Sequence, residues 1–322
     1  MERVQAPGVS RMGDIDIKNV VRVGLVGCGR VAECGYLPAF RLVRGIALVG
    51  IADVNPSRCR TLAPQIPAYE NIQSLIQAGG MDALVISVPT RFHLEYARCA
   101  AEAGIPSLVE KPPGVDMQEA KAMQALKPTP WVAFNRRFEP ALMALKESLP
   151  HVHGFRLRLE LHYRRTTWKP FDMHDDALLD LGPHLIDLAR LLAESEVRSA
   201  RTLSLGRQHA KFELELSRGR AVVACSTNRP YRERMEITDE NGRNLASYRR
   251  GGIVSGIMVR LRPKAENPLV RSLVGQLEAF AQVVRGGSSG SLGSASDGVA
   301  VMSVIEAVRL SAAERSTPVA VK

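Results

Sequence analysis

The first part of the chain carries short, almost wholly apolar runs separated by longer mixed stretches. Runs of this kind, rich in Val and Ile, predict strands that are buried on both faces of a parallel sheet. Two intervening stretches, residues 94–103 and 117–126, have the length and pattern of crossover helices. Strands alternating with helices indicate an α/β layer with right-handed connections. The predicted strands are residues 20–26, 46–52, 83–88, 107–109 and 131–134.

The pattern changes after Pro140, where apolar and polar residues alternate. Alternation with a period of two predicts an antiparallel sheet with one covered face. Leucines spaced three and four apart predict two amphipathic helices, over residues 177–192 and 269–284, and a further helical pattern begins near Val301. The second part is therefore predicted as α+β, built on an open, mainly antiparallel sheet. Its strands are predicted at residues 155–162, 211–216, 220–226 and 234–238.

The composition is that of an ordinary globular protein. Apolar residues make up 45% and charged residues 24% of the 322 residues, which allows a core and excludes wholesale disorder. No apolar run approaches the ~18 residues that a membrane span needs, and the first twenty residues lack the apolar block of a secretory signal. The five cysteines include no C-x-x-C pair, so we expect neither a disulfide framework nor a zinc site. We expect the protein to lie in the reducing cytoplasm.

A glycine-rich turn follows the first predicted strand directly and opens a helical stretch. Residues 27–32 read Gly-Cys-Gly-Arg-Val-Ala, which is the G-x-G-x-x-A pattern in its required context. The first glycine allows a tight turn, the second lets the backbone approach a pyrophosphate, and the small third residue lets helix and strand pack closely. The helix N-terminus then offers N–H groups to the phosphates. The turn predicts a dinucleotide site, and a plain β–α turn is the alternative.

Asp53 ends the next predicted strand, slightly further from Gly27 than the usual ~20 residues. A carboxylate there can bind the ribose 2′-hydroxyl of NAD and would repel the 2′-phosphate of NADP. Val54 supplies no cation in its place, although Arg58 could reach round. NAD is therefore favoured, and NADP stays a second option.

Two further polar segments stand at the ends of predicted strands. Residues 88–93 read Val-Pro-Thr-Arg-Phe-His, and residues 110–113 read Glu-Lys-Pro-Pro. Ligands of doubly wound sheets lie at this edge, so His93 and Lys111 can face one crevice. A lysine can bind a substrate hydroxyl and stabilise a developing alkoxide, and an X-Pro bond such as the one after Lys111 can be cis. The alternatives are that His93 packs on the next helix and that Lys111 is solvated.

Residues 180–187 read Asp-Leu-Gly-Pro-His-Leu-Ile-Asp. Asp180 and His184 share a face if this segment is helical despite Gly182 and Pro183, although Pro183 could instead mark the first turn of a helix. A carboxylate beside an imidazole fixes its tautomer and raises its basicity, which suits a proton acceptor. The alternative is an ordinary helix N-terminus whose acids favour the dipole.

The order of these motifs resembles the Gfo/Idh/MocA family of NAD(P)-dependent oxidoreductases. The resemblance covers nearly the whole chain, and its most specific marks, E-K-P and D-x-G-x-H-x-x-D, are intact. It implies an α/β Rossmann domain with a doubly wound parallel sheet, followed by an α+β domain with an open, mainly antiparallel sheet. The expected division is a flexible tail (1–19), a dinucleotide-binding Rossmann domain (20–127), a substrate-binding and oligomerisation domain (128–295) and a C-terminal helix that packs back on the Rossmann domain (296–322).

The resemblance also implies an activity and roles for residues. Hydride would move between the nicotinamide and a secondary alcohol or ketone of a sugar, sugar derivative or cyclitol. His184 is the expected proton acceptor, Asp180 would orient it and Lys111 would polarise the oxygen, and Lys111 and His184 could exchange these roles. The implied cofactor-binding residues are Gly27, Gly29, Arg30, Val31, Ala32, Asp53, Pro89, Thr90, His93, Glu110 and Lys111.

The loop before the D-x-G-x-H element departs from the family pattern. Many members carry a glycine cluster there, whereas residues 173–176 read Met-His-Asp-Asp. This loop should border the substrate, so the substrate cannot be carried over, and His174 and Asp175 are candidate substrate contacts. Together with Asp176, Asp180 and His184 they could form a metal cluster, but hydride transfer in the family needs no metal, so we expect none.

Three other functions compete with this one. An NAD-using glycosidase of the same fold would hydrolyse its substrate without net redox, and intact Lys111 and His184 speak against an inactive ligand-sensing relative. The net charge of +10 and the basic stretch 243–271 would suit nucleic acid, but no recognised motif accompanies them. We therefore expect a sugar-like substrate, which the surplus charge would suit if it is anionic, and neither nucleic acid nor a membrane as partner. A homodimer or homotetramer is expected, because the family's open sheet face commonly pairs subunits and an exposed apolar face would be costly.

Overall fold

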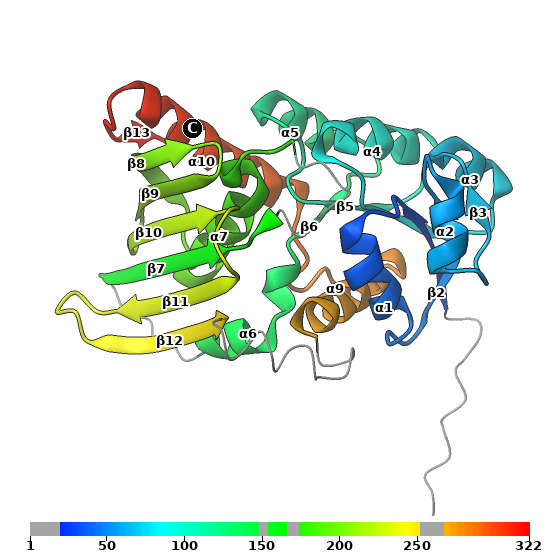
Figure 1. Ribbon diagram of the computed structural model, residues 1–322, viewed down its shortest axis with the longest axis horizontal. Coiled ribbons are helices and arrows are strands. Elements are labelled where there is room, and N and C mark those ends of the chain that lie inside the picture. The colour runs from blue at the N-terminus through cyan, green and yellow to red at the C-terminus, as the bar shows by residue number, and fades with distance from the viewer. Residues whose placement is uncertain (1–19, 148–153, 166–173, 252–266) are drawn as a thin grey trace, which may run out of the picture.

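The computed structural model describes residues 20–147, 154–165, 174–251 and 267–322. The expected tail (1–19), Met173 and residues 252–266 of the basic stretch lie outside this part of the chain. Figure 1 shows two sheets at opposite ends of an elongated molecule, with helices packed between them.

The first sheet has six parallel strands in the order β3-β2-β1-β4-β5-β6. The order reverses between β1 and β4, so a crevice opens there at the carboxyl edge, as in doubly wound sheets. The predicted Rossmann sheet is confirmed, and β6 extends it past residue 127. The strands are β1 (Val21–Val26), β2 (Ile46–Ala52), β3 (Ala68–Tyr69), β4 (Ala83–Ile86), β5 (Ser107–Glu110) and β6 (Trp131–Ala133).

Helices cover both faces of this sheet. Three of them begin at side-chain caps, where Asn55, Asn71 and Asp116 each accept a bond from the backbone N–H three residues on. The strands between them are buried, and all four residues of β4 are inaccessible to solvent. The helical segments are η2 (Ala32–Tyr36), α1 (Leu37–Phe40), α2 (Pro56–Leu62), α3 (Ile72–Ala78), η3 (Thr90–Phe92), α4 (His93–Glu102), α5 (Met117–Gln124), η4 (Asn135–Phe138) and α6 (Pro140–Glu147).

The second sheet has seven strands in the order β12-β11-β7-β10-β9-β8-β13. Only β7 and β10 pair in parallel, so the predicted mainly antiparallel sheet is confirmed. The strands are β7 (Phe155–His162), β8 (Val197–Gly206), β9 (His209–Leu216), β10 (Gly219–Ser226), β11 (Arg232–Thr238), β12 (Asn244–Gly251) and β13 (Val319–Ala320).

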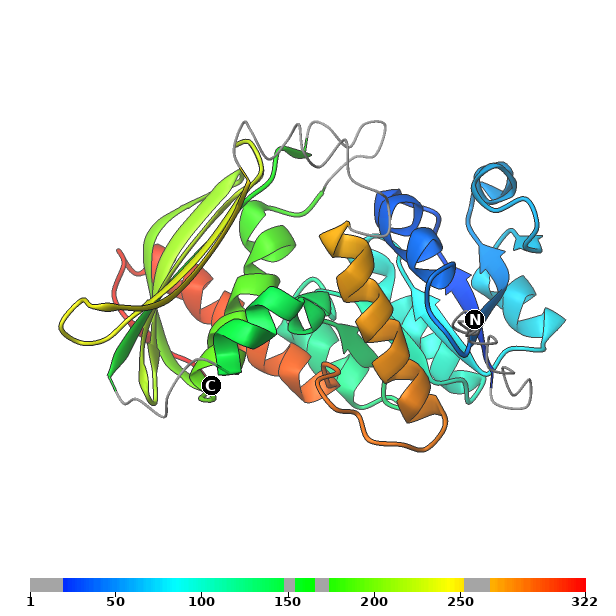
Figure 2. The ribbon, with the colours of Figure 1, turned by 90° about the horizontal axis from the view of Figure 1, so that it is seen from below.

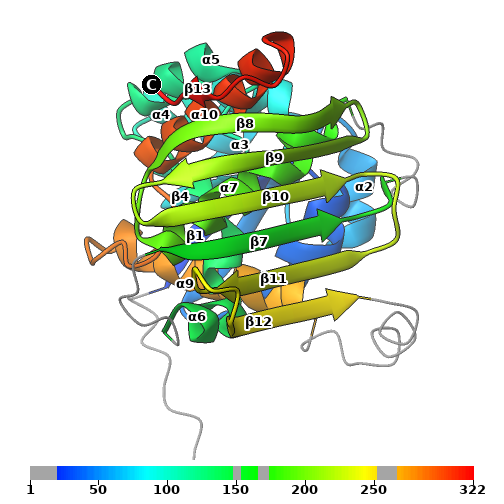
Figure 3. The ribbon, with the colours of Figure 1, turned by 90° about the vertical axis from the view of Figure 1, so that its left-hand side faces the viewer.

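The two faces of the second sheet differ in chemistry. The inner face packs on the leucine stripe of α7 (Ala177–Ala193), which is helical despite Gly182 and Pro183. Figure 3 looks onto the outer face, which no described helix covers. This face is charged rather than apolar, so the argument for an oligomer from an exposed apolar surface does not hold. Its exposed side chains include Arg156, Arg158, Lys211, Glu215, Arg220 and Arg232.

Helix α9 (Pro268–Val284) returns to the first sheet (Figure 2), whereas the last strand, β13, pairs with β8 of the second sheet. Helix α9 buries Leu273, Leu277 and Phe280 against η2, α1 and β2. Helix α10 (Ala295–Ala313) packs on α5 as well as on α7 and β8. The leucine spacing of α9 predicts the helix but not its partner, and the packing joins α9 to the first sheet rather than to the second domain of the expected division.

Arg137 of η4 ties the two halves together. Its guanidinium forms a buried ion pair of 2.6 Å with Asp187 of α7 and lies 3.2 Å from Asp297 of α10. Asp187 is the last residue of the D-x-G-x-H-x-x-D motif, and it has this structural contact instead of facing the crevice.

Candidate active site

The glycine turn after β1 is tight on one side and open on the other. Gly27 has a φ of +96°, and a Cβ added there would lie 2.2 Å from the Ser87 carbonyl oxygen, so only glycine fits. A Cβ added at Gly29 would meet nothing within 4 Å. The backbone at Gly29 is therefore bare and accessible, as close approach by a pyrophosphate requires.

Asp53 binds the glycine turn from the end of β2. Its Oδ2 accepts a hydrogen bond from the Cys28 N–H at 2.6 Å, and its Oδ1 accepts one from the Asn55 N–H at 2.8 Å. A carboxylate has further lone pairs, so it can still bind a ribose hydroxyl. The Arg58 side chain does extend to the glycine turn. Its Nε donates to the Cys28 carbonyl at 2.6 Å, and its guanidinium pairs with Glu33 at 2.8 Å.

In the segment after β4, His93 and Thr90 make different contacts. His93 is 1% exposed, and its Nδ1 and Nε2 lie 2.6 and 2.9 Å from the carbonyl oxygens of Pro112 and Val88. Burial lowers the pKa of His93. Both ring nitrogens lie against backbone carbonyl oxygens, and the neutral ring donates to one of them, so His93 supports the loops after β4 and β5. Thr90 instead donates to Asp175 at 2.6 Å and thereby joins this edge to the loop before α7.

Lys111, at the end of β5, reaches across to α7. The Lys111–Pro112 bond is cis. The Lys111 side chain is 12% exposed, and its Nζ donates to the Asp180 carbonyl at 2.6 Å and lies 3.6 Å from Asp180 Oδ1. The preceding Glu110 accepts a hydrogen bond from the Tyr36 hydroxyl at 2.8 Å, and burial raises the pKa of its carboxyl. The E-K-P and D-x-G-x-H segments thus meet at one place.

The Asp180 carboxylate is held by a residue that the sequence motifs do not include. Arg165 donates its Nε to Oδ2 at 2.6 Å and its terminal nitrogen to Oδ1 at 2.5 Å. Burial raises the pKa of Asp180, but Arg165 and Lys111 outweigh burial and keep this pKa below its usual range. Asp180 is therefore an ionised carboxylate between two cations.

His184 lies on the next turn of α7, and the expected contact with Asp180 is not made. Asp180 uses both oxygens on Arg165, and the buried Nδ1 of His184 has no partner among the described residues. Burial, followed by Lys111, Arg136 and Arg165, lowers the pKa of His184 well below its usual range. The ring is thus neutral near pH 7 and can accept a proton, while its unpartnered nitrogen can bind a polar ligand.

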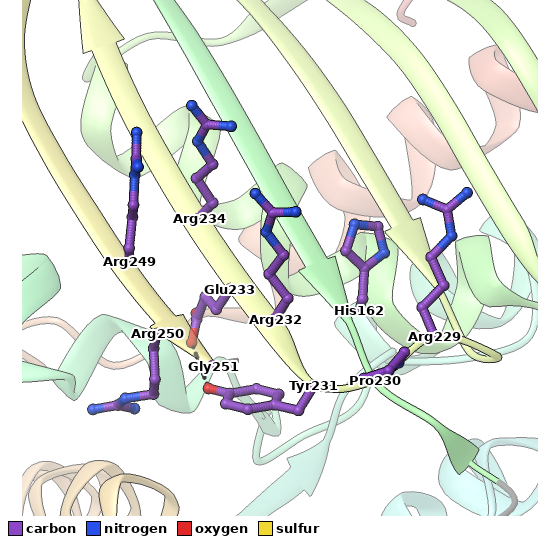
Figure 4. A pocket seen from close by; sticks show the side chains of 10 residues that line it. All are labelled: His162, Arg229, Pro230, Tyr231, Arg232, Glu233, Arg234, Arg249, Arg250 and Gly251. Atoms are coloured by element: carbon purple, nitrogen blue, oxygen red, sulfur yellow. Dashed lines mark hydrogen bonds between the residues drawn. The ribbon is translucent and has the colours of Figure 1, made fainter. Parts of the chain in front are cut away.

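Beyond these residues lies a pocket of about 510 Å³ at the ends of β7, β11 and β12. Glu233, one of its lining residues, is buried and accepts hydrogen bonds from Arg136 and, at 3.0 Å, from the Tyr231 hydroxyl. Figure 4 shows cationic side chains aligned along the outer face of the sheet, with Tyr231 directed to Glu233. The lining residues are His162, Arg229, Pro230, Tyr231, Arg232, Glu233, Arg234, Arg249, Arg250 and Gly251.

One comparison with known proteins matches the first sheet of this chain, and another matches most of its length. Residues 21–129 match the model of the oxidoreductase family with the NAD-binding Rossmann fold. Rhizopine catabolism protein MocA of Rhizobium meliloti is 26% identical over 308 residues, which are 89% of this chain and 93% of that protein. The dinucleotide-binding part of the chain, residues 21–129, belongs to the Gfo/Idh/MocA oxidoreductase family. Its cofactor is NAD, which the open turn at Gly29 and the acid at Asp53 fit.

Two other proteins that resemble this chain extend the comparison. Inositol 2-dehydrogenase of Acidothermus cellulolyticus is 29% identical over 248 residues, which are 69% of this chain and 71% of that protein. An oxidoreductase of Agrobacterium radiobacter, solved with NAD+, L-tartaric acid and magnesium, has a TM-score of 0.74 at 19% identity and covers 94% of this chain and 98% of its own. This second likeness confirms the fold.

The side of the crevice that faces the second sheet holds residues that the motifs do not mark. Arg136 and Arg165 both lower the pKa of His184, yet neither lies in a sequence motif with a known spacing. The nearest signal for Arg165 is its place just past a predicted strand. Of the two candidate substrate contacts, Asp175 binds Thr90, and His174 is exposed. Within the described ranges, no helix is long and apolar enough to cross a membrane.

Proposed function

We propose that this oxidoreductase transfers hydride between NAD and a secondary alcohol or ketone of a sugar, sugar derivative or cyclitol. The observation that carries the proposal is the contact between the two motifs. Lys111 Nζ lies 2.6 Å from the backbone carbonyl oxygen of Asp180, beside the neutral His184. These residues come from the ends of β5 and α7 and lie near the glycine turn. The name of the inositol 2-dehydrogenase relative fits this substrate class.

Each residue has a defined task in the proposed oxidation. NAD, when bound, supplies the hydride acceptor. His184 takes the proton of the substrate hydroxyl, which its low pKa allows because the ring is unprotonated. Lys111 holds the substrate oxygen and stabilises its developing charge. Asp180, kept ionised by Arg165, positions the Lys111 ammonium and does not orient the imidazole.

The test is a substrate screen with NAD and with NADP, read at the nicotinamide absorbance. Sugars, cyclitols, sugar acids and nucleotide-linked sugars form the panel. We expect reduction of NAD with at least one of them and a weaker response with NADP. Hydrolysis without net redox would favour an NAD-using glycosidase instead, and binding without turnover of any compound would favour a ligand-sensing protein.

We infer further that the substrate carries a negative charge. Three cations, Lys111, Arg136 and Arg165, act electrostatically on His184 beside the crevice. A sugar acid should therefore have a higher kcat/KM than its neutral parent, and added salt should reduce the difference. Arg136→Gln should lower this preference, because Arg136 is one of the three cations that act on His184, whereas Arg220→Gln, exposed on the outer face of the second sheet, should leave it unchanged. Equal use of both sugars would exclude a charged substrate.

We also propose how the chain is divided, how it assembles and where in the cell it lies. The chain divides into a nucleotide-binding part and a substrate-binding part, and it forms a homodimer or homotetramer through the outer face of the second sheet. The support is the width of this uncovered seven-stranded face. Light scattering that gives the mass of one chain at micromolar concentration would exclude the oligomer. A cytoplasmic location is supported by five free cysteines, and fractionation of expressing cells tests it.

A further inference from the structure

Two cysteines meet inside the glycine turn, and no step of the proposed reaction uses them. Cys28 stands between Gly27 and Gly29, and its Sγ lies 2.9 Å from the Sγ of Cys59 on α2. Both side chains are wholly buried, and both are free thiols. The sulfur atoms are thus in contact but not bonded.

Cys28 is held at three atoms by one neighbouring segment. Its N–H donates to Asp53 at 2.6 Å, its carbonyl accepts from Arg58 at 2.6 Å, and its sulfur contacts Cys59. Asp53, Arg58 and Cys59 all belong to the end of β2 and to α2. The position of the pyrophosphate turn is therefore coupled to the segment that carries the ribose-binding acid.

We propose that Cys28 and Cys59 are a redox modification site, at which a reversible disulfide weakens NAD binding. A disulfide bond is about 2.05 Å long, so the sulfur atoms must approach by roughly 0.9 Å from their present contact. That movement draws Cys28 toward α2 and shifts the bare backbone at Gly29. Close approach to a pyrophosphate depends on this backbone.

The chemistry requires a hydroperoxide as oxidant. The Cys59 thiolate attacks the peroxide oxygen, which forms a sulfenic acid and releases an alcohol or water. The Cys28 thiol then attacks that sulfur, which forms the S–S bond and releases water. The balance is two thiols plus one hydroperoxide giving one disulfide, one alcohol and one water. The hydrogen bond from Cys28 lowers the pKa of Cys59, which makes Cys59 the first nucleophile.

Thermodynamic linkage predicts a second effect, in which NAD binding changes the thiol–disulfide equilibrium. If NAD binds the dithiol form more tightly by some factor, NAD must shift the thiol–disulfide equilibrium toward the dithiol by the same factor. A cell in which NAD is scarce would then lose the enzyme to oxidation more easily than one in which NAD is abundant.

The experiment treats the whole protein with hydrogen peroxide and maps its tryptic peptides. We expect the peptide of residues 23–30 joined to the peptide that contains Cys59, with the loss of two hydrogen atoms. Calorimetric titration with NAD should show a Kd raised by about fivefold or more, as is typical of coupled sites, and dithiothreitol should restore it. Saturating NAD should oppose the cross-link in a glutathione redox buffer.

Two variants sharpen the result. Cys59→Ser should bind NAD as the untreated protein does and should be insensitive to peroxide. Cys99→Ser, which removes a thiol on α4, should respond as the unaltered chain does. The proposal is overturned if no 28–59 cross-link forms, or if it forms and the Kd for NAD stays the same. The comparison of oxidised with re-reduced wild-type protein decides this even if a variant fails to fold.

Discussion

The two sides of the crevice are built in different ways. The cofactor side comes from adjacent strands of one parallel sheet, and backbone groups of Cys28, Asn55 and Pro112 hold its side chains Asp53 and His93 in place. The substrate side brings together a lysine from the first sheet, two residues of α7 and arginines from the second half. One side is thus held mainly by contacts between side chains and backbone, and the other depends on buried charges that must balance.

The largest effect is expected on the substrate side. Lys111→Ala removes the cation that holds the substrate oxygen, so kcat should fall by about 10²- to 10⁴-fold. The Kd for NAD should change less than kcat, because the glycine turn is untouched. Steady-state kinetics and calorimetry measure the two quantities. Lys121→Ala, exposed on α5, is the matched control, and a kcat within tenfold of wild type would remove Lys111 from the reaction.

Next in size is the cost of unbalancing the buried charges. Arg165→Met leaves the Asp180 carboxylate, which is 4% exposed, with Lys111 as its remaining cation. The free energy of unfolding in urea should fall by about 3 kcal/mol. Arg158→Met breaks an ion pair of an arginine that is 55% exposed and should cost about 0.5 kcal/mol or less. Similar losses in both variants would mean that the substrate side is not held by buried charge.

The pH dependence of stability should also report the substrate side. The pKa of His184 is lowered in the folded chain, so below about pH 6.5 the unfolded chain binds a proton that the folded chain does not. Stability must therefore fall on acidification from pH 6.5 down to the folded pKa, by about 1.4 kcal/mol per pH unit for one such group.

The same shift places the acid limb of kcat well below pH 6.5. His184→Asn should reduce the slope of stability against pH, and it should abolish the acid limb together with most of the activity. His209→Asn, exposed on β9, should change neither. An acid limb of the unaltered enzyme at pH 6.5 would show that His184 is not the proton acceptor.

The smallest effect is expected on the cofactor side. Asp53→Asn keeps an acceptor for one backbone N–H but removes the charge that repels a 2′-phosphate. The preference for NAD over NADP should fall by about fivefold, since a hydrogen bond to a charged group is worth about 1 kcal/mol more than a neutral one. Ratios of kcat/KM with the two cofactors measure this. Glu102→Gln, exposed on α4, should leave the ratio unchanged, and so would Asp53→Asn if backbone alone selected the cofactor.

The same contrast explains how far the sequence could be interpreted. Gly27, Gly29 and Asp53 lie in a local pattern with a local cause, so their places at the crevice follow from spacing. Arg165 has no such pattern, because its contact with Asp180 depends on how β7 and α7 pack in space. The expected Asp180–His184 contact is absent for the same reason, since a guanidinium from elsewhere occupies the carboxylate.

Parts of the fold were also beyond sequence patterns. Strand β8 buries only Val197, Ala200 and Thr202, and register shifts interrupt its alternation, so it lacks a regular signal. The stripe of α9 predicts a helix, but an apolar stripe does not say which sheet it will cover. His93 stands at a strand end as expected, yet it opens α4 and turns its ring to backbone carbonyls.

The return of α9 has a consequence for how the chain is made. Leu273, Leu277 and Phe280 are wholly buried against the first sheet, and each contributes about 2 kcal/mol through burial. Their sum is comparable with the whole stability of a typical domain. The nucleotide-binding half is therefore discontinuous along the polypeptide. A nascent chain that has left the ribosome only as far as β6 holds an unfinished core, and this half reaches its stable fold only when synthesis is nearly complete.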